Sequence, residues 1–105
     1  MKFSAGQTIF AEGEEGHNMY FIVSGRVEIR SADNLIHSLG EGEIFGEMAL
    51  IDQSPRSADA VAVADCELEE ISERAFVFRI GEAPFFALKV MRTLASRLRE
   101  ANQGK

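Results

Sequence analysis

The sequence predicts a mainly β fold: an antiparallel, jelly-roll-like β-roll that contains one short helix and is followed by two C-terminal helices. Glycines recur as turn signals through the first half of the chain, and the segments between them are short and rich in β-branched and aromatic residues. Apolar spacing of three and four residues appears only near the C-terminus. The 105 residues suffice for one domain, so we expect a roll over about residues 1–71 and a helical tail over about 73–102.

The strands of the roll are expected between the glycine turns. Residues 19–24 and 26–30 flank a Ser-Gly turn, and apolar and charged residues alternate in the second segment, which predicts a hairpin. A first strand is expected to start at Lys2 and Phe3. Further strands are predicted at residues 8–10, 35–39, 57–64 and 66–71.

A motif with binding chemistry lies between these strands, at residues 45–58, which read FGEMALIDQSPRSA. Gly46 has no Cβ and lets the backbone approach a ligand, while the carboxylate of Glu47 accepts hydrogen bonds from sugar hydroxyls. Residues 47–51 are good helix formers and predict about one helical turn, whose N-terminal N–H groups favour an anion. Arg56 adds a planar fork of donors that matches phosphate oxygens. The motif therefore predicts an anion site.

Residues 45–58 resemble the phosphate-binding cassette of cyclic nucleotide-binding domains. That module is shared by cAMP-dependent kinase regulatory subunits, cyclic nucleotide-gated channels and bacterial catabolite activator proteins. The resemblance implies that Glu47 binds the ribose 2′-hydroxyl and that Arg56 pairs with the cyclic phosphate. It also implies that the pocket is completed, mostly through backbone N–H groups, by Phe45, Gly46, Met48, Ala49, Ser57 and Ala58.

The implied ligand is cAMP, with cGMP as the alternative. Hydroxyls at the position of Ser57 donate to guanine in some cGMP-selective relatives, yet serine also occurs in cAMP-binding bacterial members. An alternative without a ligand is a surface ion pair between Glu47 and Arg56, nine residues apart, which would contribute about 0 to 1 kcal/mol. The density of the match to the cassette argues against that alternative.

The helical tail is expected to begin after Ser72, a suitable N-cap for a helix over residues 73–80 that ends at Gly81. Pro84 opens a second helix, and this order of roll and helices is also that of the family. The resemblance to bacterial channel domains implies that Arg97 caps the purine; the alternative is that Arg97 complements the negative end of its helix. An apolar stripe is formed by Leu88, Met91, Ala95 and Leu98.

The charge is distributed unevenly along the chain. Residues 1–72 carry four basic and fourteen acidic residues, a net charge of −10, whereas the remainder carries seven basic and three acidic residues, a net charge of +4. An acidic roll repels a nucleic-acid backbone, so we expect no nucleic-acid binding. The sequence also contains no long apolar span and no signal-peptide core, so we expect no membrane insertion and a cytoplasmic location.

Catalysis is not expected. Cys66 is the only cysteine, lies in an apolar run and is interpreted as a buried small hydrophobe. His17 and His37 lack the spacing of the metal-binding histidines in cupin enzymes, which also use a small barrel, so no metal and no cofactor other than the nucleotide ligand is expected. No nucleophile and base pair is evident in the sequence.

The function predicted from these observations is a regulatory module that senses a cyclic nucleotide, most simply cAMP. The C-terminal helix would act as a lid or as the signal output, and a protein partner would receive the signal; a homodimer is compatible with the sequence. The alternative is a β-roll that serves as a protein-interaction scaffold with a vestigial nucleotide site, the basic tail docking on a partner or on a second copy.

Overall fold

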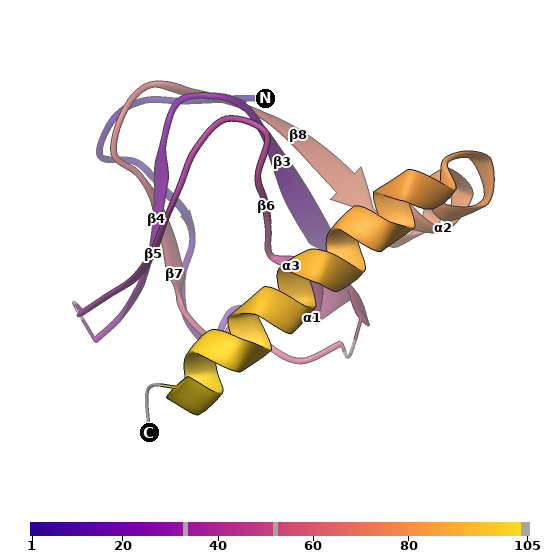
Figure 1. The fold of residues 1–105 in the computed structure, drawn as a ribbon. Helices are drawn as coiled ribbons and strands as arrows, with labels where there is room; N and C mark the ends of the chain where they lie inside the picture. The colour runs from indigo at the N-terminus through magenta and orange to yellow at the C-terminus, as the bar shows by residue number, and fades with distance from the viewer. Residues whose placement is uncertain (33, 52, 104–105) are drawn as a thin grey trace. The chain divides into compact units, whose positions relative to one another are not determined.

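The computed structural model describes residues 1–32, 34–51 and 53–103 of the chain, the last three by their backbone alone (Figure 1). The chain divides into two compact units, Met1–Glu73 and Arg74–Lys105. The first unit contains β1 (Lys2–Phe3), β2 (Thr8–Phe10), β3 (Asn18–Ser24), β4 (Val27–Ser31), β5 (Asn34–Leu39), β6 (Ile44–Phe45), α1 (Glu47–Ile51), β7 (Asp59–Ala62) and β8 (Cys66–Ser72). The second contains most of α2 (Glu73–Glu82) and all of α3 (Pro84–Gln103).

The strands of the first unit form two antiparallel sheets, which confirms the predicted β-roll. One sheet has the order β1-β8-β3-β6 and the other has the order β2-β7-β4-β5. The longest pairing joins β3 to β8, which lie side by side in Figure 1, with Met19 opposite Ile71 and Tyr20 opposite Glu70. The predicted hairpin is split between the sheets, because β3 belongs to the first sheet and β4 to the second.

The core lies between residues of both sheets. Ile22 and Leu68 contribute from the first sheet, and Val27 and Ala60 from the second; all four are at most 1% exposed. Cys66 is also buried, as predicted, and its Sγ lies 3.3 Å from the carbonyl oxygen of Arg26. Buried positions alternate with less buried ones along β7 and the first half of β8, since successive side chains of a strand point to opposite faces.

Three aromatic rings form the end of the core next to α1. Tyr20 and Phe45 stack with centroids 5.2 Å apart, and Phe10 lies 5.9 Å from Phe45 and 6.1 Å from Tyr20. Their strands, β3, β6 and β2, are not consecutive in the sequence, so the roll assembles this cluster from distant segments.

The structure corrects several predicted boundaries. Strand β6 was not predicted, because its two residues are too short to display a period of two; it pairs with Tyr20 and Phe21. Strand β7 covers only Asp59–Ala62, matching the four residues of β4 that pair with it. Gly81 does not end α2, which runs on to Glu82, because its φ lies outside the left-handed region that a glycine stop requires.

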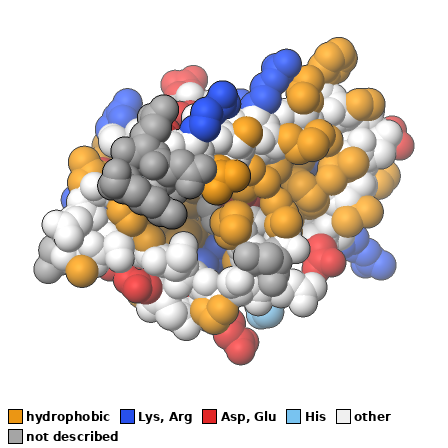
Figure 2. Space-filling model, turned by 60° about the horizontal axis from the view of Figure 1, so that its bottom comes forward, with side chains coloured by type: hydrophobic (Ala, Val, Ile, Leu, Met, Phe, Trp, Pro, Cys, Tyr) orange, Lys and Arg blue, Asp and Glu red, His pale blue; other side chains and the backbone are white. Residues whose placement is uncertain are grey.

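The second unit consists of two helices that contact each other through aromatic side chains. Phe76 and Phe86 meet edge to face with centroids 5.9 Å apart, and the guanidinium of Arg79 lies 5.7 Å from the ring of Phe86. No residue of α2 is buried, and Phe85 of α3 is 84% exposed. Hydrophobic side chains are conspicuous on the face drawn in Figure 2. None of the helices within the described residues has the length and hydropathy that a membrane span requires.

Candidate functional site

The predicted cassette begins at a glycine whose conformation only a residue without a side chain adopts easily. Gly46 joins β6 to α1 with φ at +78°. A Cβ at this position would lie 2.8 Å from Nη1 of Arg56 and 3.4 Å from the ring of Phe10. The turn directs Glu47 into the first position of α1, where its side chain is 1% exposed. The backbone therefore places a buried carboxylate at the start of α1, and the role predicted for Glu47 stays a prediction.

Arg56 is held by its main chain as well as by its side chain. Its N–H donates to the carbonyl of Glu14 at 2.8 Å, and its carbonyl accepts from the N–H of Gly13 at 2.8 Å. These two bonds fix the segment before β7 against the turn between β2 and β3. The residue is only 7% exposed, so both Glu47 and Arg56 are buried, which contradicts the alternative of a surface ion pair.

The Arg56 guanidinium is bound by neutral groups. Nη1 donates to the carbonyl of Gly46 at 3.0 Å, and Nη2 donates to the carbonyl of Asn18 at 2.8 Å. Cζ lies 4.0 Å from the ring centroid of Phe10 and 5.9 Å from that of Tyr20. Within the described residues, Arg56 makes no ion pair, and its buried Nε has no hydrogen-bond acceptor.

Desolvation at this position disfavours the charged form of Arg56. Burial lowers the pKa of the Arg56 guanidinium, and the negative charges of Glu14 and Glu47 oppose that effect without forming an ion pair with it. Burial of an incompletely neutralised cation is costly, and an anion within hydrogen-bond reach would reduce that cost. The site thus has the charge, the donors and the desolvation that favour a phosphate.

Tyr20 links this site to β8. Its hydroxyl donates to Oε2 of Glu70 at 3.1 Å, and its ring stacks on Phe45. Burial, followed by the charge of Glu70, raises the pKa of Tyr20. Phe45 as a whole is 1% exposed and belongs to the core, and its predicted contact with a ligand stays a prediction.

The remaining predicted site residues differ in accessibility. Ala49 and Ala58 are buried, whereas Met48 is 48% exposed and the Ser57 side chain is also exposed. Arg97 lies in α3, in the second unit, and its role stays a prediction. Sequence reasoning missed Phe10, Gly16 and Asn18; the run of small and acidic residues before β3 marked a turn but did not indicate that it reaches Arg56.

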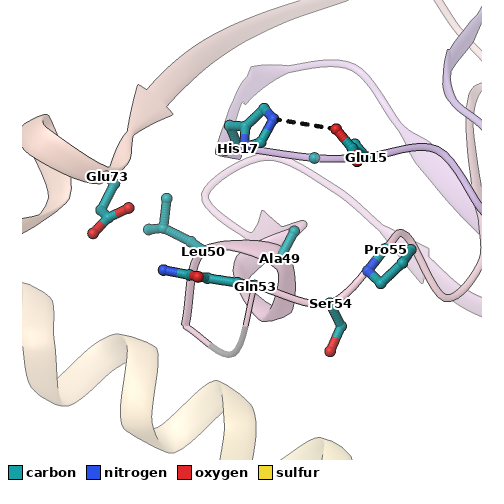
Figure 3. Close-up of a pocket in the computed structure, with 9 residues that line it drawn as sticks. Glu15, His17, Ala49, Leu50, Gln53, Ser54, Pro55 and Glu73 are labelled. Atoms are coloured by element: carbon teal, nitrogen blue, oxygen red, sulfur yellow. Dashed lines mark ion pairs between the residues drawn. The ribbon is translucent and has the colours of Figure 1, made fainter.

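A cavity of about 340 Å³ is lined by residues of α1, of the segment after it and of the turn before β3 (Figure 3): Ala49, Leu50, Gln53, Ser54, Pro55, Glu15, Gly16 and His17, together with Glu73. Ala49 lines it, but neither Glu47 nor Arg56 does. His17 and Glu15 point toward each other there, with Nε2 and Oε2 4.0 Å apart, and both side chains are more than four-fifths exposed, at 83% and 88%. Among the described residues no group of three or more His, Cys, Asp or Glu side chains is arranged to hold a metal ion; His37 lies apart on β5.

Comparison with known proteins identifies the family. A profile described as the cyclic nucleotide-binding domain matches residues 1–82. A CRP-like cAMP-activated global transcriptional regulator of Mycobacterium tuberculosis is 35% identical over 95% of this chain and 47% of its own length. A cyclic nucleotide-gated potassium channel of Rhizobium etli is 38% identical over 89% of this chain and 26% of its own length.

A solved structure gives the same result. The catabolite activator protein of Thermus thermophilus superposes with a TM-score of 0.89 and 37% identity over 99% of this chain and 51% of that protein. This chain thus spans at most about half the length of each of these relatives. On the strength of the matched profile, the relatives and the shared fold, the chain belongs to the cyclic nucleotide-binding domain family.

Proposed function

We propose that this chain is a regulatory module that binds a cyclic nucleotide, with cAMP as its ligand. The observation that carries the proposal is the buried guanidinium of Arg56, which has two carbonyl partners, no ion pair among the described residues and a buried Nε that lacks an acceptor. A cyclic phosphate would supply the missing negative charge. The name of the M. tuberculosis relative, a cAMP-activated regulator, supports cAMP over other nucleotides.

In the proposed complex each cassette residue has one role. Arg56 pairs with the cyclic phosphate, and Glu47 accepts a hydrogen bond from the ribose 2′-hydroxyl. Both side chains are buried, and charged groups that leave water favour a partner of matching shape. The phosphate and ribose are further enclosed by backbone groups of Phe45, Gly46, Met48, Ala49, Ser57 and Ala58.

The proposal also covers how the base is bound and how binding is signalled. Arg97 stacks on the purine, and α3 folds over the nucleotide as a lid, so that the closed state becomes more populated when ligand binds. The exposed hydroxyl of Ser57 next to Arg56 leaves cGMP as a second ligand to be compared directly. Hydrogen exchange of residues 84–102 with and without nucleotide tests the lid, and equal protection in both states would contradict it.

Isothermal titration with cAMP and with cGMP tests the binding itself. Losing one charge-assisted partner costs about 1.5–3 kcal/mol, so we expect Arg56→Ala to weaken binding by roughly 10- to 150-fold. Arg26→Ala is the matched control, because Arg26 lies on the same roll but is exposed and donates to Ser38 at 2.7 Å. Absence of binding to either nucleotide, with an unchanged melting temperature, would refute the proposal.

The module is proposed to bind and signal rather than to catalyse. Its relatives named above are a transcriptional regulator and a channel, so the receiving partner differs between them. One of these relatives is a transcriptional regulator, so the comparison does not support the expectation that this chain binds no nucleic acid. Measuring the binding of duplex DNA in low salt, with and without cAMP, would test that expectation directly.

A second function, self-association as an interaction scaffold, is favoured by the helical unit. The predicted stripe on α3 is exposed: Leu88 by 36%, Met91 by 58% and Leu98 by 64%. Spacings of three and four residues are those of a helix that packs along a second helix. The proposed partner is a second copy of the chain, and sedimentation equilibrium would detect it.

A further inference from the structure

The Arg56 guanidinium lies in a slot that residues outside the cassette create. The ring of Phe10, from β2, lies under it with its centroid 4.0 Å from Cζ. A Cβ built on Gly16, in the turn before β3, would lie 2.2 Å from Nε, 2.4 Å from Cζ and 2.8 Å from Nη2. These distances are too short for any side chain at position 16 while Arg56 keeps its place, so the missing side chain of Gly16 is part of the slot.

The slot orients the guanidinium before any ligand binds. Carbonyls of Gly46 and Asn18 take one donor each from Nη1 and Nη2, and the aromatic face of Phe10 favours a flat cation parallel to or above it. A long, flexible side chain that is already ordered loses less conformational freedom when a ligand arrives. Lysine, a point charge without a planar fork, would not fill the same space.

We propose that Gly16 and Phe10 are positioning residues of the nucleotide site, which act through Arg56 and set its affinity for the cyclic phosphate. This inference rests on the proposed function for its ligand. Its structural part concerns only the protein without ligand: Gly16 provides the space, Phe10 provides the face, and a change at either position displaces the guanidinium from the carbonyls that hold it.

Gly16 offers a clean test because its φ lies outside the left-handed region. An alanine there strains no backbone, so its effect reports the contact with Arg56. Gly6 is the matched control: its φ is +91°, but a Cβ there would meet nothing within 4 Å. Gly6→Ala should therefore lower stability through backbone strain and leave the affinity of the folded protein unchanged.

The first experiment uses the full chain without nucleotide. Urea midpoints are measured for wild type, Gly16→Ala, Arg56→Ala and the double variant. We expect Gly16→Ala to lower the midpoint in the wild-type background and to have a smaller effect once Arg56 is alanine, because the added methyl group then has no guanidinium to meet. If the two substitutions lower the urea midpoint additively, the proposed contact between position 16 and Arg56 is wrong. This result does not depend on any nucleotide binding.

The second experiment measures cAMP affinity by isothermal titration. We expect Gly16→Ala to weaken binding roughly tenfold, and Phe10→Leu to weaken it by a similar factor, because both release Arg56 from its fixed position. Equal affinity of Gly16→Ala and wild type would overturn the positioning role. If wild type binds no cyclic nucleotide, the proposed function fails while the urea cycle still decides whether the slot exists.

Discussion

The roll and the helical unit of this protein each retain an unfavourable feature after folding, and the two features differ in kind. In the roll, charge is buried without full neutralisation: Arg56 is 7% exposed and makes no ion pair among the described residues. In the helices, apolar surface is left in solvent: Phe85 and Leu98 are 84% and 64% exposed, and no residue of α2 is buried. An anion would stabilise the buried charge of the roll, and an apolar surface would cover the exposed side chains of the helices.

The contrast arises from how each unit is built. The roll closes two sheets around a core, and the loops at its end bring glycines and carbonyls against one arginine. Two helices cannot bury all of their apolar residues on each other, since each helix contacts its neighbour through one face only. The proposed ligand binding and the proposed self-association can therefore be tested separately by mutation.

The largest effect is expected at the helical stripe. In the proposed dimer, Leu98→Lys would place a charge on the exposed stripe of both copies and remove about 1.5–3 kcal/mol of burial from each, so we expect association to weaken by at least a hundredfold. Sedimentation equilibrium measures it. Ser96→Lys, exposed on the same helix but outside the stripe, is the control and should leave the mass unchanged. A wild-type protein that stays monomeric at high concentration would contradict the proposed self-association of the helical unit.

A smaller effect is expected when the ribose contact of the roll is removed. Titration of Glu47→Ala with cAMP, and of wild type with 2′-deoxy-cAMP, should each show affinity lower by about 10- to 150-fold, the cost of a hydrogen bond to a charged group. The two changes should not add, because each deletes one side of the same contact. Independent, additive losses would place the 2′-hydroxyl elsewhere.

Arg97 concerns both units, since it lies in the helical unit but is proposed to stack on the base of the nucleotide. Stacking of a guanidinium on a base contributes about 0.5–2 kcal/mol, so Arg97→Ala should weaken cAMP binding several-fold, to at most about 30-fold. Isothermal titration beside Arg99→Ala, an exposed arginine of the same helix, isolates the effect. Unchanged affinity in Arg97→Ala would remove the base contact from the proposal.

The smallest effect concerns Tyr20. Burial and Glu70 raise its pKa above the ordinary value of 10.0, so the stability linked to the protonated phenol is complete below about pH 10 and is lost as the pH rises toward the folded-state pKa. Urea midpoints between pH 9 and 11 should fall more steeply for wild type than for Tyr20→Phe. At neutral pH the variant should lose about 0.5–1.5 kcal/mol, one hydrogen bond. Parallel pH profiles for both proteins would contradict this coupling.

Local features of the sequence predicted most of the elements. The Ser-Gly turn, the alternation in residues 26–30 and the good helix formers of residues 47–51 depend on nearby residues only, and the structure contains the corresponding strands and the short helix. Errors fell where local signals were too short or ambiguous, at the two-residue β6 and at Gly81, where Pro84 rather than the glycine separates the helices.

The chemistry of residues 45–58 can be read from the sequence, because residue types at close spacing define what a loop can bind. The burial of Arg56 and its slot cannot be read in this way. Phe10, Gly16, Gly46 and Arg56 meet only after β2, β3 and β6 have packed, and no local pattern records which distant backbone a guanidinium will touch. Such contacts depend on long-range packing, so the kind of ligand follows from the motif, while the residues that hold Arg56 in place follow from the fold.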